Sequence, residues 1–495
     1  MFSVDIISMK EFHDMKERIV RIQKIELINL KNVGKGTIQF ACNMKDDIFE
    51  DKADLLGIYG QNGSGKTALI YALGLFKSLI MGNKLGKDCA NYIKFGKESA
   101  TCAFELSIID ADKQRFKMVY EFELKRNEVE VEQTDLLELD EDEKDEDREN
   151  QVYVSMEKVS MSTLVGGKWS KLTPVLSYCE EEDNILSPKI RLSQLISGDK
   201  KIEDELRVTK LLMKKSSKSF LFSKELNKII QNSKMDAEYK SIINILHEYA
   251  TYNLHVISNA QTGIINANIA LPFSFVLKEK DSFALLKGSL NLNGTSIIPL
   301  KFFDSITEKM EMINLVLIEI IPGLTISLKK LGTRIDKNNE EIVLAQIIAI
   351  RGETQIPLKY ESDGIKKLVS ILYGLIMVFN NSSTTLAVDE FDSGIFEYLL
   401  GEILKVVEEN GKGQLIFTSH NLRPLEVINK KNIMVTTTNE NNRYIRFKNV
   451  KTNNNFRDLY FHDIILGGQN ECIYETTNPY MIRRAFRMAG HEDGE

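Results

Sequence analysis

Cysteine, tryptophan and histidine are rare in this chain of 495 residues, which has five, one and six of them. The five cysteines are Cys42, Cys89, Cys102, Cys179 and Cys472, and they form no Cys-x-x-Cys pair. Such spacing supports neither a cysteine zinc site nor a disulfide framework.

Long apolar runs are also absent. The longest lies near Ile371–Phe379, far short of the ~20 residues that cross a bilayer. Residues 1–21 mix charges and contain no apolar segment typical of a secretory signal. We therefore expect a cytoplasmic protein with no membrane partner.

The chain does have enough apolar material for a large core. Hydrophobic residues make up 43% of it, and its formal net charge is −7. At this length we expect two or three domains. Because the net charge is negative, any nucleic-acid surface must be local.

A glycine-rich motif of the form G-x-x-x-x-G-K-[ST] begins at residue 60. It consists of Gly60, Gln61, Asn62, Gly63, Ser64, Gly65, Lys66 and Thr67. The apolar stretch 55–59 predicts a strand before it, and residues 68–73 predict a helix after it. In that setting backbone N–H groups face phosphate oxygens, Lys66 reaches the β- and γ-phosphates and Thr67 ligates Mg²⁺. The motif predicts a nucleoside triphosphate site; a plain glycine-rich turn before a helix is the weaker interpretation.

A pair of carboxylates lies far downstream. Residues 384–388 form a short β-branched run of the kind buried in a parallel sheet, and Asp389 and Glu390 follow it. At the carboxyl edge of that strand, Asp389 would hold Mg²⁺ through water and Glu390 would be the general base for the attacking water. Most Asp-Glu pairs are solvated surface carboxylates. Here the buried strand and the phosphate-binding motif favour the catalytic interpretation.

The segment Glu361-Ser362-Asp363-Gly364 precedes apolar residues with a 3.6-residue period. Ser362 or Asp363 is therefore expected to cap a helix. Taken alone, the pattern fits a well-capped core helix equally well.

Two more segments follow the carboxylates. Phe391-Asp392-Ser393-Gly394 comes directly after Glu390. Residues 415–419 predict another strand, and His420 at its end is placed to hydrogen-bond a γ-phosphate. A lone histidine there would more often be structural.

Taken together, these motifs have the order found in ABC-type ATPases. The chain resembles the RecF, SMC and overcoming-lysogenisation-defect branch of that class, and most of all the stand-alone ATPases of anti-phage operons such as PARIS and Septu. Residues 25–32, a predicted strand, look like the usual start of this branch. The resemblance covers roughly residues 22–160 and 320–440. The signature reads Glu-Ser-Asp-Gly and not the transporter-like Leu-Ser-Gly-Gly, which argues against a transporter subunit.

The resemblance implies an α/β fold, namely a P-loop NTPase head of the ABC type. Such a head has a mixed sheet flanked by helices and an antiparallel β-lobe. ATP and Mg²⁺ are the implied cofactors. The implied assembly is a head-to-tail homodimer or a higher homo-oligomer, in which Ser362 and Gly364 face the γ-phosphate bound at Lys66 of the partner subunit. ATP binding would close the dimer and hydrolysis would open it.

The wide spacing between the two halves of the site predicts inserted segments. Strand-like runs at 102–109, 115–124, 128–133 and 152–159 predict the β-lobe, and the acidic run 138–147 predicts a solvated hairpin loop. From about 195 to 255 the pattern is helical but breaks at Ser216-Ser217 and Ser233, which predicts a short helical insertion and no long coiled coil.

The expected domains are therefore three. Residues 1–200 form the N-terminal half of the head, residues 201–310 a mainly helical insertion, and residues 311–495 the C-terminal half with a tail. In the tail, residues 443–448 predict a strand and residues 480–488 an amphipathic helix. No nuclease or toxin motif can be placed there, so an effector of that kind is expected to be a separate chain.

Two classes of function remain open. The first is an ATPase switch and scaffold of a bacterial defence complex that controls a separate effector. The second is a RecF-like ATPase that binds DNA in repair, with the basic stretches 207–240 and 443–457 as its candidate surfaces. Neither the trigger nor the Q-loop residue can be read from the sequence.

Overall fold

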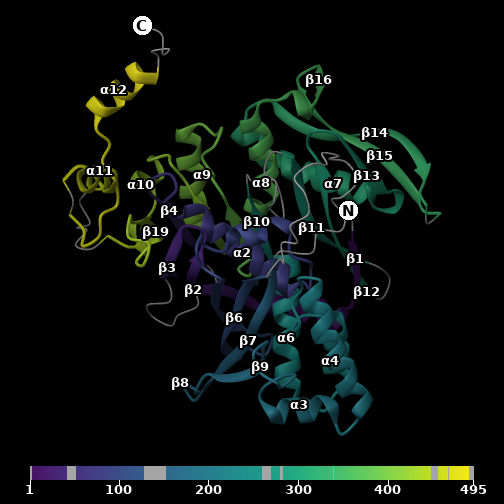
Figure 1. Cartoon of the computed structure of the whole chain (residues 1–495). Coiled ribbons are helices and arrows are strands. Elements are labelled where there is room, and N and C mark those ends of the chain that lie inside the picture. The colour runs from purple at the N-terminus through teal and green to yellow at the C-terminus, as the bar shows by residue number, and fades with distance from the viewer. Residues whose placement is uncertain are drawn as a thin grey trace, which may run out of the picture.

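The computed structural model describes residues 3–41, 52–127, 152–258, 269–278, 282–337, 339–447, 455–466 and 468–489. Over these residues sheets and helices are mixed, and the fold is α/β as predicted (Figure 1). Cys42, the expected strand 128–133 and the acidic run 138–147 lie outside the described residues.

A six-stranded sheet forms the centre of the molecule. Its strands, in spatial order, are β10 (Leu254–Ile257), β17 (Thr385–Val388), β18 (Gln414–Thr418), β4 (Asp54–Tyr59), β19 (Ile433–Thr436) and β20 (Tyr444–Ile445). The first five are parallel, and β20 pairs antiparallel with β19. β4, β17 and β18 are buried along their whole length, as strands of a covered parallel sheet should be. Their carboxyl ends therefore lie side by side at one edge.

Both faces of this sheet are covered. Leu56 and Ile58 of β4 belong to a core shared with α2 (Lys66–Ile80) and the β-lobe. Leu55 and Tyr59, the alternate residues, belong to a second core. That core is shared with α8 (Asp363–Asn380), α9 (Glu397–Asn410), α10 (Pro424–Val427) and α7 (Leu300–Ile320). The period-2 alternation of each strand thus divides one sheet between two cores.

The predicted antiparallel β-lobe is present. It contains β3 (Val33–Gln39), β2 (Ile19–Leu30), β5 (Ser99–Ile109), β6 (Arg115–Arg126), β7 (Val152–Val165), β8 (Lys168–Trp169) and β9 (Thr173–Cys179). Gln414 of the central sheet joins the lobe to it, because its amide accepts from Ile22 N and donates to Ile22 O, both at 2.8 Å.

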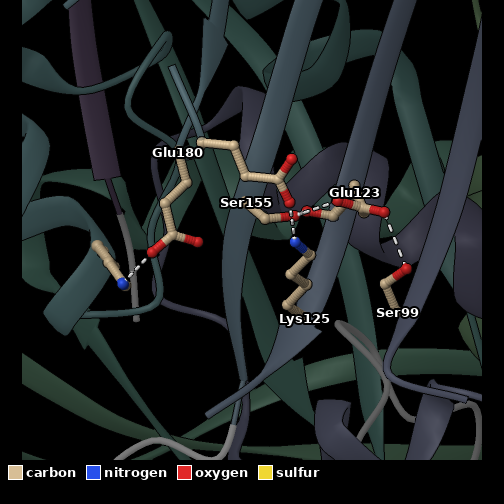
Figure 2. A network of polar contacts seen from close by, with 7 residues as sticks. Ser99, Glu123, Lys125, Ser155 and Glu180 are labelled. Atoms are coloured by element: carbon tan, nitrogen blue, oxygen red, sulfur yellow. Dashed lines mark hydrogen bonds and ion pairs between the residues drawn. The ribbon is translucent and has the colours of Figure 1, made fainter. Parts of the chain in front are cut away.

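The helical insertion contains α3 (Lys189–Ile196), α4 (Lys200–Lys215), α5 (Lys224–Asn232) and α6 (Ala237–Glu248). α4 ends at Ser216 and α5 at Ser233, where the sequence predicted breaks. These helices are short, the longest having 16 residues, so this insertion is no coiled-coil arm. It docks on the β-lobe through ion pairs such as that of Lys214 with Glu180, beside a network in which Glu123 accepts from Ser99 and Ser155 (Figure 2).

The second half of the expected insertion contains strands before its last helix. After a π-helical turn at Tyr249–Asn253 the chain enters β10 of the central sheet, then β11 (Ala270–Lys278), β12 (Ser282–Asn291) and β13 (Thr295–Pro299) before α7. The expectation of mainly helical structure over 201–310 therefore fits residues 201–253 and 300–310, but the described residues between 254 and 299 form strands. The reason is that Leu254–Ile257 is a four-residue buried run whose place beside β17 suits a strand. The domain boundaries themselves stay predictions.

Two small sheets and three more helices complete the described chain. β1 (Ser3–Ser8) pairs with β12, and β13, β14 (Leu324–Ile335), β15 (Glu341–Arg351) and β16 (Thr354–Pro357) form the other sheet. The helices are α1 (Met9–Glu17), α11 (Phe456–Leu466) and α12 (Pro479–Ala489); Figure 1 shows α12 projecting from the body. Among the described helices none has the length and apolar character that a membrane span requires.

Candidate functional site

The glycine-rich loop connects β4 to α2 and opens onto a cavity of about 1020 Å³. Gly60, Gly63 and Gly65 have φ angles of 145°, 73° and 100°, which side chains disfavour. At Gly60 a side chain is also excluded by space, since its Cβ would lie 1.8 Å from Thr436 Oγ1. Asn62, Gly63, Gly65, Lys66 and Thr67 line the cavity. The loop therefore presents glycine backbone together with Asn62, Lys66 and Thr67 to the cavity, a set suited to phosphate binding.

Lys66 folds back over its own loop. Its Nζ donates to Gly60 O at 2.8 Å and to Gln61 O at 2.9 Å. Burial lowers the pKa of Lys66 to about 8, although the nearby carboxylates of Asp389 and Glu390 oppose the shift. A bound triphosphate would offer this amine stronger acceptors than two neutral carbonyl groups.

Oxygen ligands suited to Mg²⁺ meet between α2 and the end of β17. Thr67 Oγ1 donates to Asp389 Oδ1 at 3.3 Å. This contact places the two oxygens close enough to serve one Mg²⁺, as predicted, with Thr67 as a direct ligand and Asp389 acting through a bound water. Burial raises the pKa of Asp389, while hydrogen bonds from Thr418 and Thr67 work against that rise. A cation would replace those donors as the partner of the carboxylate.

Thr418, which the sequence did not single out, holds both carboxylate residues. It donates to Asp389 Oδ1 and accepts from Glu390 N, each at 2.7 Å. β17 and β18 pair in parallel with Val388 opposite Phe417, so the next residues along, Asp389 and Thr418, are neighbours. The strand order would have revealed Thr418, but a single sequence does not give that order.

Glu390 and His420 both line the cavity beside the glycine-rich loop. The loop that carries His420 is fixed by Asp392, whose Oδ2 accepts from His420 N at 3.1 Å and from Asn421 N at 3.0 Å. Partial burial and then the charge of Lys66 lower the pKa of His420, so its neutral form is favoured.

Ser362 and Gly364 lie elsewhere. Ser362 is exposed and caps α8, where its Oγ accepts from Ile365 N at 3.3 Å. Gly364 packs against Gly394, whose carbonyl oxygen would lie 1.9 Å from a Cβ at position 364. Neither residue lines the cavity at the glycine-rich loop, so far as the described residues extend.

The structure thus has a glycine-rich loop between β4 and α2, carboxylates after β17 and a histidine after β18. The capped start of α8 lies outside the cavity that these groups line. The fold is that of a P-loop NTPase head.

Behind the P-loop of this head, the β19–β20 hairpin supplies three side chains that the sequence analysis missed. Tyr444 donates to Gly65 O at 2.6 Å, and Thr436 donates to Tyr59 O at 3.1 Å. Arg443 donates to Thr437 O and to Asn32 O, both at 2.6 Å. Tyr444 thus fixes the P-loop, Thr436 fixes the strand that leads into it, and Arg443 fixes the hairpin to the turn between β2 and β3.

The same contacts revise the interpretation of the basic stretch 443–457. Arg443 is 7% exposed. Arg446 donates to Gln39 O at 2.6 Å and also to the backbone carbonyl groups of Lys431 and Ile433. The guanidinium group of Arg443 is therefore buried in the head, and that of the half-buried Arg446 is bound to backbone carbonyl groups. β20 also covers only Tyr444–Ile445, shorter than the expected strand at 443–448.

Comparison with known proteins gives a partial match and several remote ones. A sequence profile described as an AAA domain matches residues 24–252, which include the P-loop but not the carboxylates or His420. No curated protein matches the chain.

Among solved structures, the Smc head domain of Pyrococcus furiosus bound to the C-terminal domain of ScpA is 12% identical, with 86% of this chain and 96% of that chain covered and a TM-score of 0.35. The SMC head domain from Thermotoga maritima is 14% identical, with 86% and 99% covered and a TM-score of 0.34. The recombination mediator RecF with ATP is 14% identical, with 81% and 94% covered and a TM-score of 0.32. At such values the roles of individual residues must be argued from this chain's own geometry.

Proposed function

We propose that this protein is an ATP-hydrolysing switch whose active sites form between two copies of the chain, and that it serves a bacterial anti-phage complex by controlling a separate nuclease or toxin. One observation carries the composite site. The P-loop, Glu390 and His420 converge on one cavity, whereas Ser362 and Gly364 of the same chain lie outside it.

Within one chain the binding half is complete. The P-loop N–H groups and Lys66 take the β- and γ-phosphates, and Thr67 and Asp389 hold Mg²⁺. Bound there, Mg²⁺ offsets the negative charge of the phosphates. Glu390 accepts the proton of the attacking water, and His420, which lines the same cavity, contacts the γ-phosphate.

The signature half is available to a partner. Ser362 and Asp363 are exposed at the start of an 18-residue helix, whose N-terminus favours an anion. The aligned backbone dipoles of α8 and the Ser362 hydroxyl would meet the γ-phosphate held by the other copy. With two such sites in one dimer, each ATP contacts both copies, and its hydrolysis removes these contacts.

A switch is favoured over a DNA-binding role because many basic side chains are already engaged. In the stretch 207–240, Lys214 pairs with Glu180 and Arg207 with Glu203, and Lys240 donates to two carbonyl groups. The DNA-binding alternative rests on the lysines that stay exposed on the insertion, such as Lys224 and Lys228. An ATP-dependent, salt-sensitive shift of duplex DNA, lost in a Lys224→Ala and Lys228→Ala double variant, would favour it.

The composite site is tested by complementation. Ser362→Arg blocks docking of the signature by its bulk and charge but leaves the P-loop intact. Lys66→Ala removes the phosphate cation but leaves the signature intact. Each variant alone should hydrolyse ATP at under a tenth of the wild-type rate. Their mixture should recover activity, because one site of each mixed dimer pairs an intact Lys66 with an intact Ser362.

Hydrolysis in the mixture that does not exceed the sum of the separate variants would contradict the composite site. Nucleotide binding must be measured in parallel. Ser362→Arg should bind ATP as the wild type does, and Lys66→Ala should not.

A further inference from the structure

Glu390 has an unusual backbone. Its φ is 46°, in the left-handed region that glycine and asparagine favour and glutamate rarely adopts. Such a conformation persists only where the surroundings hold it, and it is frequent at functional sites. The residue proposed to activate water is therefore held in a strained conformation by its neighbours.

Three contacts hold that conformation. Glu390 N donates to Thr418 Oγ1 at 2.7 Å, and Glu390 O accepts from Ser393 N at 2.9 Å. The third is a side chain from another element, since Lys367 Nζ also donates to Glu390 O. It reaches Asp389 O as well, at 3.3 Å. Lys367 thus donates to the backbone carbonyl groups of both Asp389 and Glu390.

Lys367 lies at a place where packing alone would select an apolar residue. It is 1% exposed in α8, and Leu368, Val369, Ile371 and Leu372 after it are all in the core. A buried ammonium group is costly unless it has close partners, and an apolar side chain usually serves stability equally well there. Burial lowers the pKa of Lys367 to about 8, against the charges of Glu390, Asp392 and Asp389.

We propose that Lys367 is a positioning residue, which holds the backbone of Glu390 so that its carboxylate is directed into the nucleotide cavity. This inference rests on the proposed role of Glu390 as the general base. It assigns to α8 a function in its own chain, separate from the docking of Ser362 at that helix's N-terminus onto the partner's nucleotide.

Lys367→Met tests the proposal, because it keeps most of the side-chain volume and removes the donor. The turnover number kcat for ATP should fall at least tenfold, while KM and ATP affinity change less than about threefold. Lys77→Met is the matched control. Lys77 is also a buried lysine, 2% exposed, whose Nζ donates to one backbone carbonyl, Leu254 O, away from the carboxylates. It should keep kcat within about twofold of the wild type.

A double-variant cycle separates positioning from a general structural role. If Lys367 acts through Glu390, then Lys367→Met should lower the residual rate of Glu390→Gln less than twofold. A second full tenfold loss in that background would overturn the proposal, and so would wild-type turnover of Lys367→Met or an equal loss in Lys77→Met.

Lys367→Arg covers the case in which the methionine variant does not fold. It keeps a charged donor at the same position and should retain at least a third of the wild-type kcat. A folded arginine variant that is as inactive as Glu390→Gln would contradict the proposal. Glu390→Gln measured alone distinguishes failure of the proposed base from failure of the proposed positioning role. If it turns over normally, the proposed base is wrong; if it is inactive while Lys367→Met is fully active, only the positioning role is wrong.

Discussion

At the scale of single residues, Thr418 shows how one hydroxyl can position the carboxylate pair of Asp389 and Glu390. It is fully buried and bonds both the side chain of Asp389 and the backbone of Glu390. We expect Thr418→Val to lower the hydrolysis rate roughly ten- to hundredfold, because an unpaired buried N–H costs about 1–3 kcal/mol. ATP affinity should stay near that of the wild type.

Single-turnover hydrolysis and nucleotide titration measure these two quantities. Thr384→Val is the matched control, since Thr384, directly before β17, is equally buried but its hydroxyl has no hydrogen-bond partner among the described residues. Equal rate losses in both variants would mean that the Thr418 contacts do not matter for catalysis.

A second residue-scale prediction concerns acid stability. Burial, together with the charges of Lys77 and Lys287, lowers the pKa of His255 to about 3. In the unfolded chain the pKa is near 6.5, so the unfolded state takes up the proton first as pH falls. The stability that neutral His255 supplies is thus present above about pH 6.5 and is lost as the pH falls from there towards 3.

From pH 7 to pH 5 this group alone should remove about 2 kcal/mol of unfolding free energy. His255→Asn, which cannot be protonated, should lose that much less over the same interval. Urea unfolding at the two pH values measures the difference, and an identical pH slope for both proteins would contradict the assignment.

At the scale of elements, the β19–β20 hairpin supports the P-loop. Tyr444 donates to Gly65 O within the loop. Removing this hydroxyl in Tyr444→Phe should weaken ATP binding about fivefold, since one hydrogen bond contributes about 1 kcal/mol. Nucleotide titration checks this. Tyr398→Phe, at an exposed ring of α9, should leave the affinity unchanged, and a Tyr444→Phe protein with wild-type affinity would show that the hairpin does not set the loop.

The elements also show what could be predicted from the sequence. β4, α2, β17, β18 and α8 were predictable because each couples an apolar pattern to a motif or a cap, as at Ser362. The β-lobe strands were predictable from their alternation. β10 was not, since a four-residue apolar run that follows a helix without a break looks like its continuation.

The supporting residues were hidden for a different reason. Lys367 resembles any lysine of an amphipathic helix, and Arg443 resembles a surface cation of a basic strand. Only the packing of α8 against the end of β17, and of β20 behind the P-loop, shows that both side chains point inward. Sequence patterns identify groups that touch a ligand, whereas groups that hold them depend on tertiary contacts.

At the scale of the whole molecule, the described part of the chain has a P-loop cavity, and Ser362 and Gly364 lie outside it. The insertion of short helices and the projecting α12 lie at opposite ends of the body in Figure 1. On the function proposed above, one copy binds nucleotide alone, and hydrolysis requires that two copies meet. The proposed dimer is therefore tested by the mass of the assembly as well as by the rate of hydrolysis.

The most direct measurement is light scattering of Glu390→Gln with and without ATP and Mg²⁺. This variant keeps Lys66 and Ser362 and removes the base, so ATP should convert monomers into a stable species of twice the mass. ADP should not, and Glu390→Gln combined with Ser362→Arg should stay monomeric with ATP. A mass that ATP leaves unchanged, in protein that demonstrably binds it, would contradict the composite site.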